Sequence, residues 1–428
     1  MGAYCTYYYN GIYLDSTKND IDISFLGLID SNDIYKLSYE NTPNYVIEHY
    51  DICGIDDEDE NFYTIIRVDK NILLDRLAIK GYSLEFSKNM FNLFLLKEIE
   101  RYEQSDYDFY QNELEILKQL NFEIWIENLK FIQSNKINRF KYQDEFENTN
   151  YILHYMLKVD WYGFKGFDIC VFLRLLLEIS EMGEFVCDIT DLLLSGYIDD
   201  DYIKNSQEKY SHSDKIIILT EGKSDIQILS RSLRLFYPHL YSYFTFMDFE
   251  NAKVEGGVGF ITGIMKSFSG VGISNKIVAI YDNDTAAKVA TKQLEKIKLP
   301  NNLKIMYLPD IEKLNNYPTL GPTGLISMNV NGMAGSIEMY LGHDALFDNH
   351  SNLYYPIQWK GYESGLSQYQ GEIIEKNLVQ KKFYEILDEC EKDNEKIKNY
   401  DFEDINIVLK NLFKMFEEYE QNSMQKEI

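Results

Sequence analysis

The chain has 428 residues, of which 45% are hydrophobic and 26% charged, a composition typical of a globular protein with two or three domains. Its formal net charge of −27 disfavours binding to nucleic acid through bulk charge, because so acidic a surface repels phosphates unless cations intervene. No apolar run approaches the roughly 18 residues of a transmembrane helix, and the first residues lack the basic segment of a signal peptide.

The five cysteines are scattered, odd in number and never spaced as C-x-x-C. This pattern argues against a disulfide framework and against a zinc ribbon, and it favours a reducing compartment. We therefore expect a cytoplasmic protein without a membrane partner.

Residues 1–206 mix strand and helix signals and predict an α+β N-terminal domain. Residues 3–14 alternate like a β-hairpin with Asn10-Gly11 as its turn. Residues 95–133 have the periodicity of helices. Residues 199–214 are polar and aperiodic, which indicates a linker.

Residues 213–345 alternate between the two kinds of signal. We expect strands at 215–221, 243–249, 276–284 and 303–310, and helices at 224–237, 257–268 and 285–298, with Ser224 and Thr285 as caps. Continuous apolar strands in this rhythm predict a parallel sheet covered by helices on both faces. The segment has 13 basic and 13 acidic residues, so the acidic excess lies outside it, where 29 basic residues face 56 acidic ones.

Residues 346–428 are expected to be mostly helical. Apolar residues recur along one helix face in two stretches, first at Ile374, Leu378, Phe383 and Leu387, then at Ile405, Val408, Leu412 and Phe416. Such stripes are typical of a core or of a homodimer interface. The predicted fold is an α/β protein in which a Rossmann-like parallel sheet, 213–345, lies between the α+β domain and a helical C-terminal region.

Acidic side chains follow two of the predicted strands. Glu221 ends the first and Asp225 comes four residues later, whereas Asp282 and Asp284 end the third. Ligands of open α/β sheets bind outside the carboxyl ends of the strands, so we expect these acids to share one crevice. Acids also interact favourably with helix N-termini, which leaves a structural role open for Asp225 and Asp284.

Clustered carboxylates repel one another unless protons or divalent cations neutralise them. Ligation by oxygen alone suits Mg²⁺ or Mn²⁺. Two such ions can stabilise the attacking and leaving oxygens of a phosphodiester. The pattern therefore predicts a site for two Mg²⁺ or Mn²⁺ ions.

The Glu at one strand end and the Asp-x-Asp at another resemble the Toprim domain, the metal-dependent phosphoryl-transfer fold of topoisomerases, bacterial primases and overcoming-lysogenization-defect (OLD) nucleases. The form "EGKSD", with an acid four residues after the Glu, is most similar to the OLD nucleases. That resemblance implies that Glu221 and Asp225 hold one ion and that Asp282 and Asp284 hold the other. It also implies a supporting acid that opens a later helix, which "GSIEMYL" places at Glu338 with Ser336 as a cap.

The resemblance further implies a general acid/base and a cation at the reacting phosphate. Glu221 is the candidate for the first role. Lys266, after the glycine-rich "GGVGF", is the first candidate for the cation, and Lys223 is the second.

The N-terminal residues resemble a second family. "MGAYCTYYYNGIYLDSTKNDID" and "DITDLLLSGYID" are similar to the HEPN/Toprim N-terminal domain, a module found ahead of HEPN or Toprim domains in bacterial proteins. This resemblance implies a role in bacterial defence against phage.

Other motifs in the sequence are weaker indications of function. Arg234 and His239 match the R-x4-H of HEPN ribonucleases but lie at the end of a predicted helix, which indicates a chance match. "GGVGFITG" lacks the GK[ST] ending of a P-loop, so an ATPase would have to be a separate partner. A topoisomerase needs a separate DNA-binding domain with a nucleophilic Tyr, and a primase needs a zinc module and a basic template-binding domain, neither of which fits this chain.

The sequence thus predicts a metal-dependent nuclease that hydrolyses the phosphodiester bonds of DNA or RNA. The alternative is a non-catalytic Toprim sensor or scaffold that binds a metal–nucleotide and signals to a partner. A basic groove would favour the nuclease, whereas uniform negative potential would favour the sensor or a partner that carries the nucleic acid.

Overall fold

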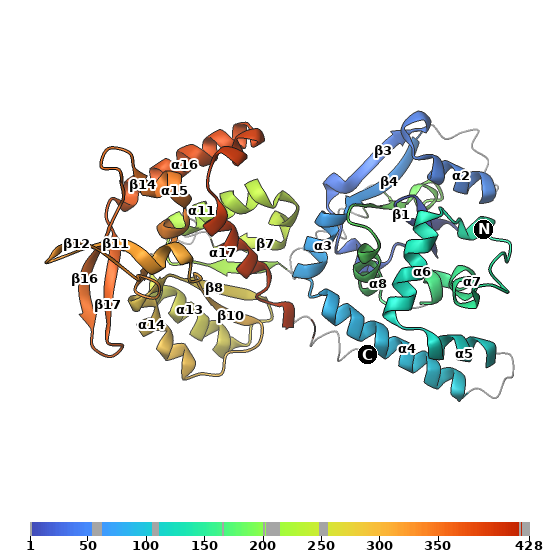
Figure 1. Cartoon of the computed structure of the whole chain (residues 1–428), viewed down its shortest axis with the longest axis horizontal. Helices are drawn as coiled ribbons and strands as arrows, with labels where there is room; N and C mark the ends of the chain where they lie inside the picture. The colour runs from blue at the N-terminus through green and yellow to red at the C-terminus, as the bar shows by residue number, and fades with distance from the viewer. Residues whose placement is uncertain are drawn as a thin grey trace. The chain divides into compact units, whose positions relative to one another are not determined.

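The computed structural model describes residues 2–53, 62–104, 111–164, 167–199, 215–247 and 256–418, together with residues 202 and 421. The chain divides into two compact units, residues 1–210 with 420–428 and residues 211–419 (Figure 1). Most of the predicted linker, 199–214, lies outside the described residues. The predicted range 213–345 and residues 346–419 of the predicted C-terminal region fall in the second unit, whereas residues 420–428 are grouped with the first.

The first unit contains an antiparallel sheet in the order β2-β1-β5-β4-β3. Its strands are β1 (Tyr4–Tyr9), β2 (Ile12–Lys18), β3 (Ile34–Ser38), β4 (Phe62–Asp69) and β5 (Glu184–Asp188). The predicted hairpin is confirmed: Asn10 and Gly11 both take positive φ, 51° and 78°, as a tight turn between β1 and β2 requires.

The described helices of the first unit pack around this sheet. They are α1 (Ile23–Leu26), α2 (Asn44–Cys53), α3 (Lys70–Ile79), α4 (Leu84–Glu103), α5 (Gln111–Gln119), α6 (Phe122–Ser134), α7 (Tyr151–Lys158), α8 (Ile169–Leu176) and α9 (Thr190–Leu194). All of α8 except Arg174 is buried, so this helix forms the centre of the core. Trp125 of α6 packs there and donates its indole N–H to the carbonyl of Tyr162 at 3.1 Å.

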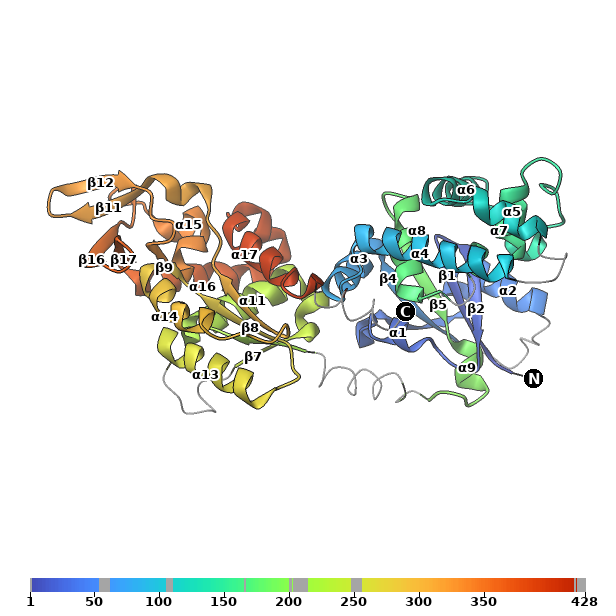
Figure 2. The same ribbon diagram turned by 90° about the horizontal axis from the view of Figure 1, so that it is seen from below.

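The second unit is built on a parallel sheet in the order β10-β8-β6-β7. The strands of this sheet are β6 (Ile216–Leu219), β7 (Phe244–Phe246), β8 (Ile277–Tyr281) and β10 (Leu303–Tyr307). The described helices of the second unit are α11 (Lys223–Phe236), α13 (Val258–Val271), α14 (Thr285–Glu295), α15 (Gly342–Leu346), α16 (Lys376–Lys392) and α17 (Glu403–Phe413). Helices α13 and α14 lie on one face of the sheet and α11 and α17 on the other (Figure 2). The prediction of a parallel sheet covered on both faces is confirmed.

Two predicted caps are wrong. The helix α11 begins at Lys223 with Gly222 at its N-cap, so Ser224 lies inside the first turn. The N-cap of α14 is Asp284, whose carboxylate accepts from the N–H of Ala287 at 2.7 Å, and Thr285 is the first helical residue. An Asp caps as well as a Ser or Thr, which explains the shift by one residue at α14.

A second sheet, in the order β12-β11-β16-β17, follows the parallel one in the chain. It comprises β11 (Tyr317–Gly321), β12 (Gly324–Met328), β16 (Ile357–Glu363) and β17 (Gln368–Ile373). Two separate two-stranded sheets pair β9 (Asn283–Asp284) with β13 (Ala334–Gly335) and β14 (Phe347–Asp348) with β15 (Leu353–Tyr354). The prediction of helices after residue 346 therefore applies from Lys376 onward. The strands before it are mostly exposed, and β16 and β17 are rich in polar residues, so they lack the alternation of buried apolar and exposed polar residues that identifies a strand in a sequence.

In the part of the chain that the structure describes, no helix is both long and apolar enough to span a bilayer.

Candidate active site

The site lies at the carboxyl ends of β6 and β8. These strands are neighbours in parallel register, with Leu219 opposite Ala279, so the residues that follow them emerge side by side. The backbone N–H of Asp282 donates to Oε1 of Glu221 at 3.1 Å. The two predicted strand ends are thus joined directly by a hydrogen bond.

Two glycines hold the backbone of Glu221. The N–H of Gly257 donates to the carbonyl of Glu221 at 2.6 Å, and a Cβ on Gly256 would lie only 2.3 Å from that same oxygen. Gly257 also takes φ +117°, a conformation that other residues rarely adopt. The backbone of the glycine-rich segment therefore packs directly against the backbone of Glu221 and fixes its position.

Asp225 occupies the first turn of α11. Its Oδ2 accepts from the N–H of Gly222 at 2.9 Å, and its Oδ1 accepts from the hydroxyl of Ser224 at 3.4 Å. This is the helix-stabilising role that the sequence left open. These two hydrogen bonds do not fully compensate the charge of Asp225. Burial and the charge of Glu338 raise the pKa of Asp225 to about 6, although the Gly222 N–H and Lys376 act to lower it.

Asp284 is held by two elements. Its Oδ1 caps α14, and its Oδ2 accepts from the side-chain amide of Gln370 on β17 at 2.7 Å. Between the two acids, the amide of Asn283 donates to Asp310 at 2.7 Å. The Asp-Asn-Asp turn is therefore fixed on both sides by the second sheet and by the end of β10.

A short strand brings Glu338 to the same place. In β13, Gly335 pairs with Asn283 and Ala334 with Asp284. A Cβ on Gly335 would lie 2.9 Å from both Cβ and the carbonyl oxygen of Asn283, so only glycine allows this approach. Three residues later, within the 3-10 helix Ile337–Tyr340, the side chain of Glu338 is fully buried.

The carboxylate of Glu338 has one paired and one unpaired oxygen. Oε1 accepts from the amide of Gln380 at 2.6 Å and lies 3.3 Å from the ammonium of Lys376, both on α16. Oε2 is buried and has no hydrogen-bond partner among the described residues. A buried carboxylate oxygen without a partner is costly, which makes it a candidate ligand atom.

All five predicted carboxylates act on one another. Burial raises the pKa of Asp282 well above its ordinary value, and four carboxylates raise it further, those of Glu221, Asp225, Asp284 and Glu338. Burial also raises the pKa of Glu221 to about 7, with Asp284 and Asp225 adding to the shift while the Asp282 N–H and Lys376 oppose it. The structure therefore brings together a cluster with more negative charge than its own contacts neutralise.

Lys376 is the cation of this cluster, and the sequence analysis missed it. It is the first residue of α16. Burial acts to lower the pKa of Lys376, but the charges of Glu338, Asp282 and Asp225 outweigh burial, so this pKa lies above its ordinary value. Lys376 reaches the cluster because α16 packs against the 3-10 helix that carries Glu338.

The two lysines predicted for this role lie elsewhere. Lys266 faces α14, where its ammonium donates to the side chain of Gln293, because α13 packs beside α14 below the sheet. Lys223 lines a hollow of about 500 Å³ beside β7 with Lys215 and Tyr241. The cation that lowers the pKa values of Glu221 and Asp225 among their main influences is instead Lys376.

The donor set suits a hard divalent cation, although no three acidic, His or Cys side chains among the described residues already converge in metal-binding geometry. The carboxylates of Glu221, Asp225, Asp284 and Glu338 each accept a backbone or amide hydrogen bond. Their chemistry nevertheless fits Mg²⁺ or Mn²⁺, since every donor is an oxygen and the cluster carries uncompensated charge.

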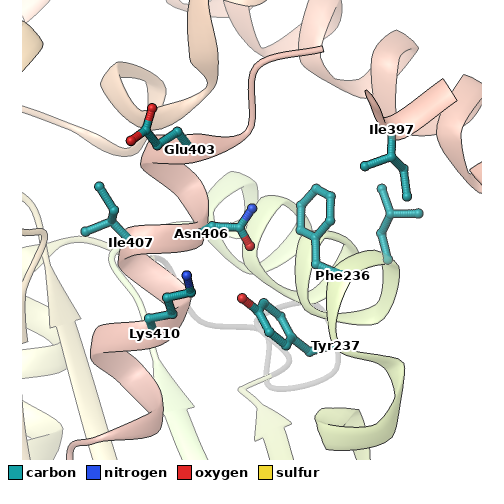
Figure 3. A pocket seen from close by; sticks show the side chains of 8 residues that line it. Phe236, Tyr237, Ile397, Glu403, Asn406, Ile407 and Lys410 are labelled. Carbon is teal, nitrogen blue, oxygen red and sulfur yellow. The ribbon is translucent and has the colours of Figure 1, made fainter. Parts of the chain in front are cut away.

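Two further hollows lie in this unit. One, of about 570 Å³, lies between the end of α11 and α17; Phe236, Tyr237, Asn406 and Lys410 point toward it, and none of the five carboxylates lines it (Figure 3). The other, of about 660 Å³, lies beside the end of β10 and includes Asn283 and Lys288. Arg234, of the R-x4-H motif, donates to the hydroxyl of Tyr241 at 2.8 Å, which is a structural contact.

Comparison with known proteins gives one match. No curated protein and no solved structure matches the chain. Residues 1–210 match a family model described as HEPN/Toprim N-terminal domain 1. This range coincides with the main segment of the first unit and confirms the resemblance drawn from the N-terminal residues. The match therefore supports a HEPN/Toprim-type N-terminal domain over residues 1–210.

Proposed function

We propose that the second unit is a Toprim-type, metal-dependent phosphodiesterase that cuts DNA or RNA, in bacterial defence against phage. The observation that carries the proposal is the carboxylate cluster: acids from three separate segments, 221–225, 282–284 and Glu338, gather around the buried Asp282 beside the partly buried Lys376. The HEPN/Toprim-type domain ahead of it supports a nucleic-acid-related role. A cluster of raised carboxyl pKa values at strand ends is typical of a functional site.

The cofactors proposed are two Mg²⁺ or Mn²⁺ ions. Glu221 and Asp225 would hold one and Asp282 and Asp284 the other, with the unpartnered Oε2 of Glu338 in support. When bound, such ions supply Lewis-acid stabilisation of the charge on a reacting phosphate.

Glu221 is the proposed general acid/base. In the site without metal, burial raises its pKa to about 7, so the carboxyl group exchanges a proton readily at neutral pH when no ion is bound. The hydrogen bond from the Asp282 N–H and the Gly257 contact fix its orientation. It can therefore take a proton from an attacking water or return one to a leaving oxygen.

Lys376 replaces Lys266 and Lys223 as the proposed cation at the phosphate. Its side chain is 37% exposed while its ammonium already contacts Glu338, so it can reach a ligand without leaving the cluster. A fixed ammonium of this kind stabilises charge that grows on non-bridging phosphate oxygens.

The sensor alternative draws on a different observation. The side-chain amides of Gln370 and Gln380 each donate to one oxygen of Asp284 and Glu338, which leaves fewer oxygens for the two ions that catalysis would need. A sensor would bind Mn²⁺–nucleotide and leave nucleic acid intact.

The test is a substrate panel. The purified protein is incubated with supercoiled plasmid, single-stranded DNA and total tRNA, each with Mg²⁺, with Mn²⁺ and with EDTA. The nuclease proposal predicts cutting of at least one substrate that EDTA abolishes. Intact substrates together with saturable Mn²⁺–nucleotide binding would favour the sensor instead.

A further inference from the structure

Three aromatic side chains form an exposed cluster on the β16–β17 hairpin. The rings of Tyr362 and Tyr369 lie 5.0 Å apart and those of Trp359 and Tyr369 5.6 Å apart, measured between centroids. Tyr362 is 57% exposed and Tyr369 48% exposed, and the two are paired across the hairpin. Trp359 is partly buried beside them, and neighbouring exposed aromatic side chains of this kind are typical of a binding surface.

The hairpin is attached to the candidate site. The carbonyl of Tyr369 accepts from the hydroxyl of Thr285 at 2.7 Å, next to Asp284. The following residue, Gln370, donates to Asp284 and accepts from the N–H of Ala286 at 2.9 Å. The aromatic cluster therefore begins one residue from a group that binds a candidate metal ligand.

The two strands beside the hairpin carry no charge, since no charged residue occurs between Lys313 and Glu338, the stretch that supplies β11 and β12. The hairpin itself carries Lys360, Glu363 and Glu372. In a chain with a net charge of −27, phosphates therefore meet less repulsion over β11 and β12 than over most of the surface. Figure 1 shows β11, β12, β16 and β17 as one layer at the end of the second unit.

We propose that the aromatic cluster of Trp359, Tyr362 and Tyr369 stacks on unpaired bases of the strand that enters the site, so that the substrate class is single-stranded or locally unpaired nucleic acid. This inference rests on the proposed function. Bases in a duplex have their faces covered by their neighbours, whereas unpaired bases can stack on aromatic side chains whatever the sequence.

The test measures binding without cleavage. Fluorescence anisotropy gives the Kd of a labelled 20-nucleotide single strand and of the matching duplex, in EDTA, for the wild type and for the double variant Tyr362→Ala/Tyr369→Ala. The matched controls are Tyr362→Phe/Tyr369→Phe, which keeps both rings, and Tyr39→Ala, which removes a tyrosine of the first unit that is 56% exposed.

Stacking predicts that the alanine variant binds the single strand about 5- to 150-fold more weakly for each base lost, while both controls bind as the wild type does. Equal affinity of the alanine variant and the wild type for the single strand would overturn the inference. So would an equal loss for the single strand and the duplex, or an equal loss in the alanine and phenylalanine variants.

The same preparations are assayed for cleavage with Mg²⁺, which separates the two proposals. Metal-dependent cutting with unchanged single-strand affinity in the alanine variant would overturn only the stacking site. Aromatic-dependent binding by a wild-type protein that cuts nothing would support the stacking site and count against the nuclease.

Discussion

The ammonium of Lys376 lies 3.3 Å from Oε1 of Glu338, whose side chain is fully buried. The two residues come from different segments, one from the start of α16 and the other from the 3-10 helix after β13. Their contact gives the carboxylate cluster a positive charge at its edge, and it distinguishes Lys376 from Lys266, which contacts Gln293.

The first prediction compares these lysines. Lys376→Ala lowers the rate of metal-dependent cleavage by about 100-fold or more, since a fixed donor at a developing charge is worth about that factor. Lys266→Ala leaves the rate within about twofold of the wild type. Rates are measured at saturating Mg²⁺; a larger loss in Lys266→Ala than in Lys376→Ala would reverse the assignment.

The second prediction separates the roles of Asp282 and Asp284. Both Asp282→Asn and Asp284→Ala abolish cleavage. Asp282→Asn also raises the free energy of unfolding at pH 8, because it removes a repelled, buried charge. Asp284→Ala lowers the free energy of unfolding by about 1 kcal/mol, because the N-cap of α14 is lost. Urea denaturation checks both signs, and a destabilised Asp282→Asn protein would contradict the charge cluster.

The third prediction concerns pH. The pKa of Glu221 is raised to about 7 and that of Asp225 to about 6, so the folded state binds more protons than the unfolded state between about pH 4 and pH 7. The stability from these two groups is therefore present at about pH 4 and is lost as the pH rises through 6 and 7.

The measurement for that prediction is the melting temperature in EDTA from pH 4.5 to pH 8. Glu221→Gln has a flatter profile over this range than the wild type does. Mg²⁺ raises the wild-type melting temperature more at pH 8 than at pH 5, because metal competes with protons for the same oxygens. If the melting temperatures of the wild type and Glu221→Gln changed in parallel with pH, Glu221 would not be the group whose raised pKa causes the pH dependence.

The fourth prediction uses two glycines. Gly335→Ala destabilises the protein by about 1–3 kcal/mol and impairs cleavage, since its Cβ would press on Asn283 and displace Glu338. Gly361→Ala is the matched control, because a Cβ there meets nothing within 4 Å. Denaturation and cleavage are measured for both; an unaffected Gly335→Ala protein would mean that the β9–β13 pairing does not position the site.

Local signals explain what could be predicted from the sequence. The strands before Glu221 and Asp282 are continuous and apolar, so the positions of their ends at the same edge of the sheet follow from the pattern of a parallel sheet. Glu338 could be predicted as a member of the site because the segment "GSIEMYL" resembles the start of a helix that carries an acid in OLD nucleases.

Long-range packing explains what could not be predicted. Lys376 reaches the cluster through the placement of α16, and no local pattern marks that helix start as part of a site. The hairpin that carries Gln370 is polar and exposed on much of its surface, so it lacks the alternation of an ordinary strand. The cap of α14 moved to Asp284 because one carboxylate serves both the helix and the cluster.

The most direct measurement is the cleavage of the preferred substrate by wild-type protein and by Glu221→Ala, each with Mg²⁺ and each shown to be folded by circular dichroism. Our account predicts that the wild type cuts and that Glu221→Ala does not, whatever the metal concentration. Equal cutting by the folded Glu221→Ala protein would contradict the assignment of the carboxylate cluster as the active site.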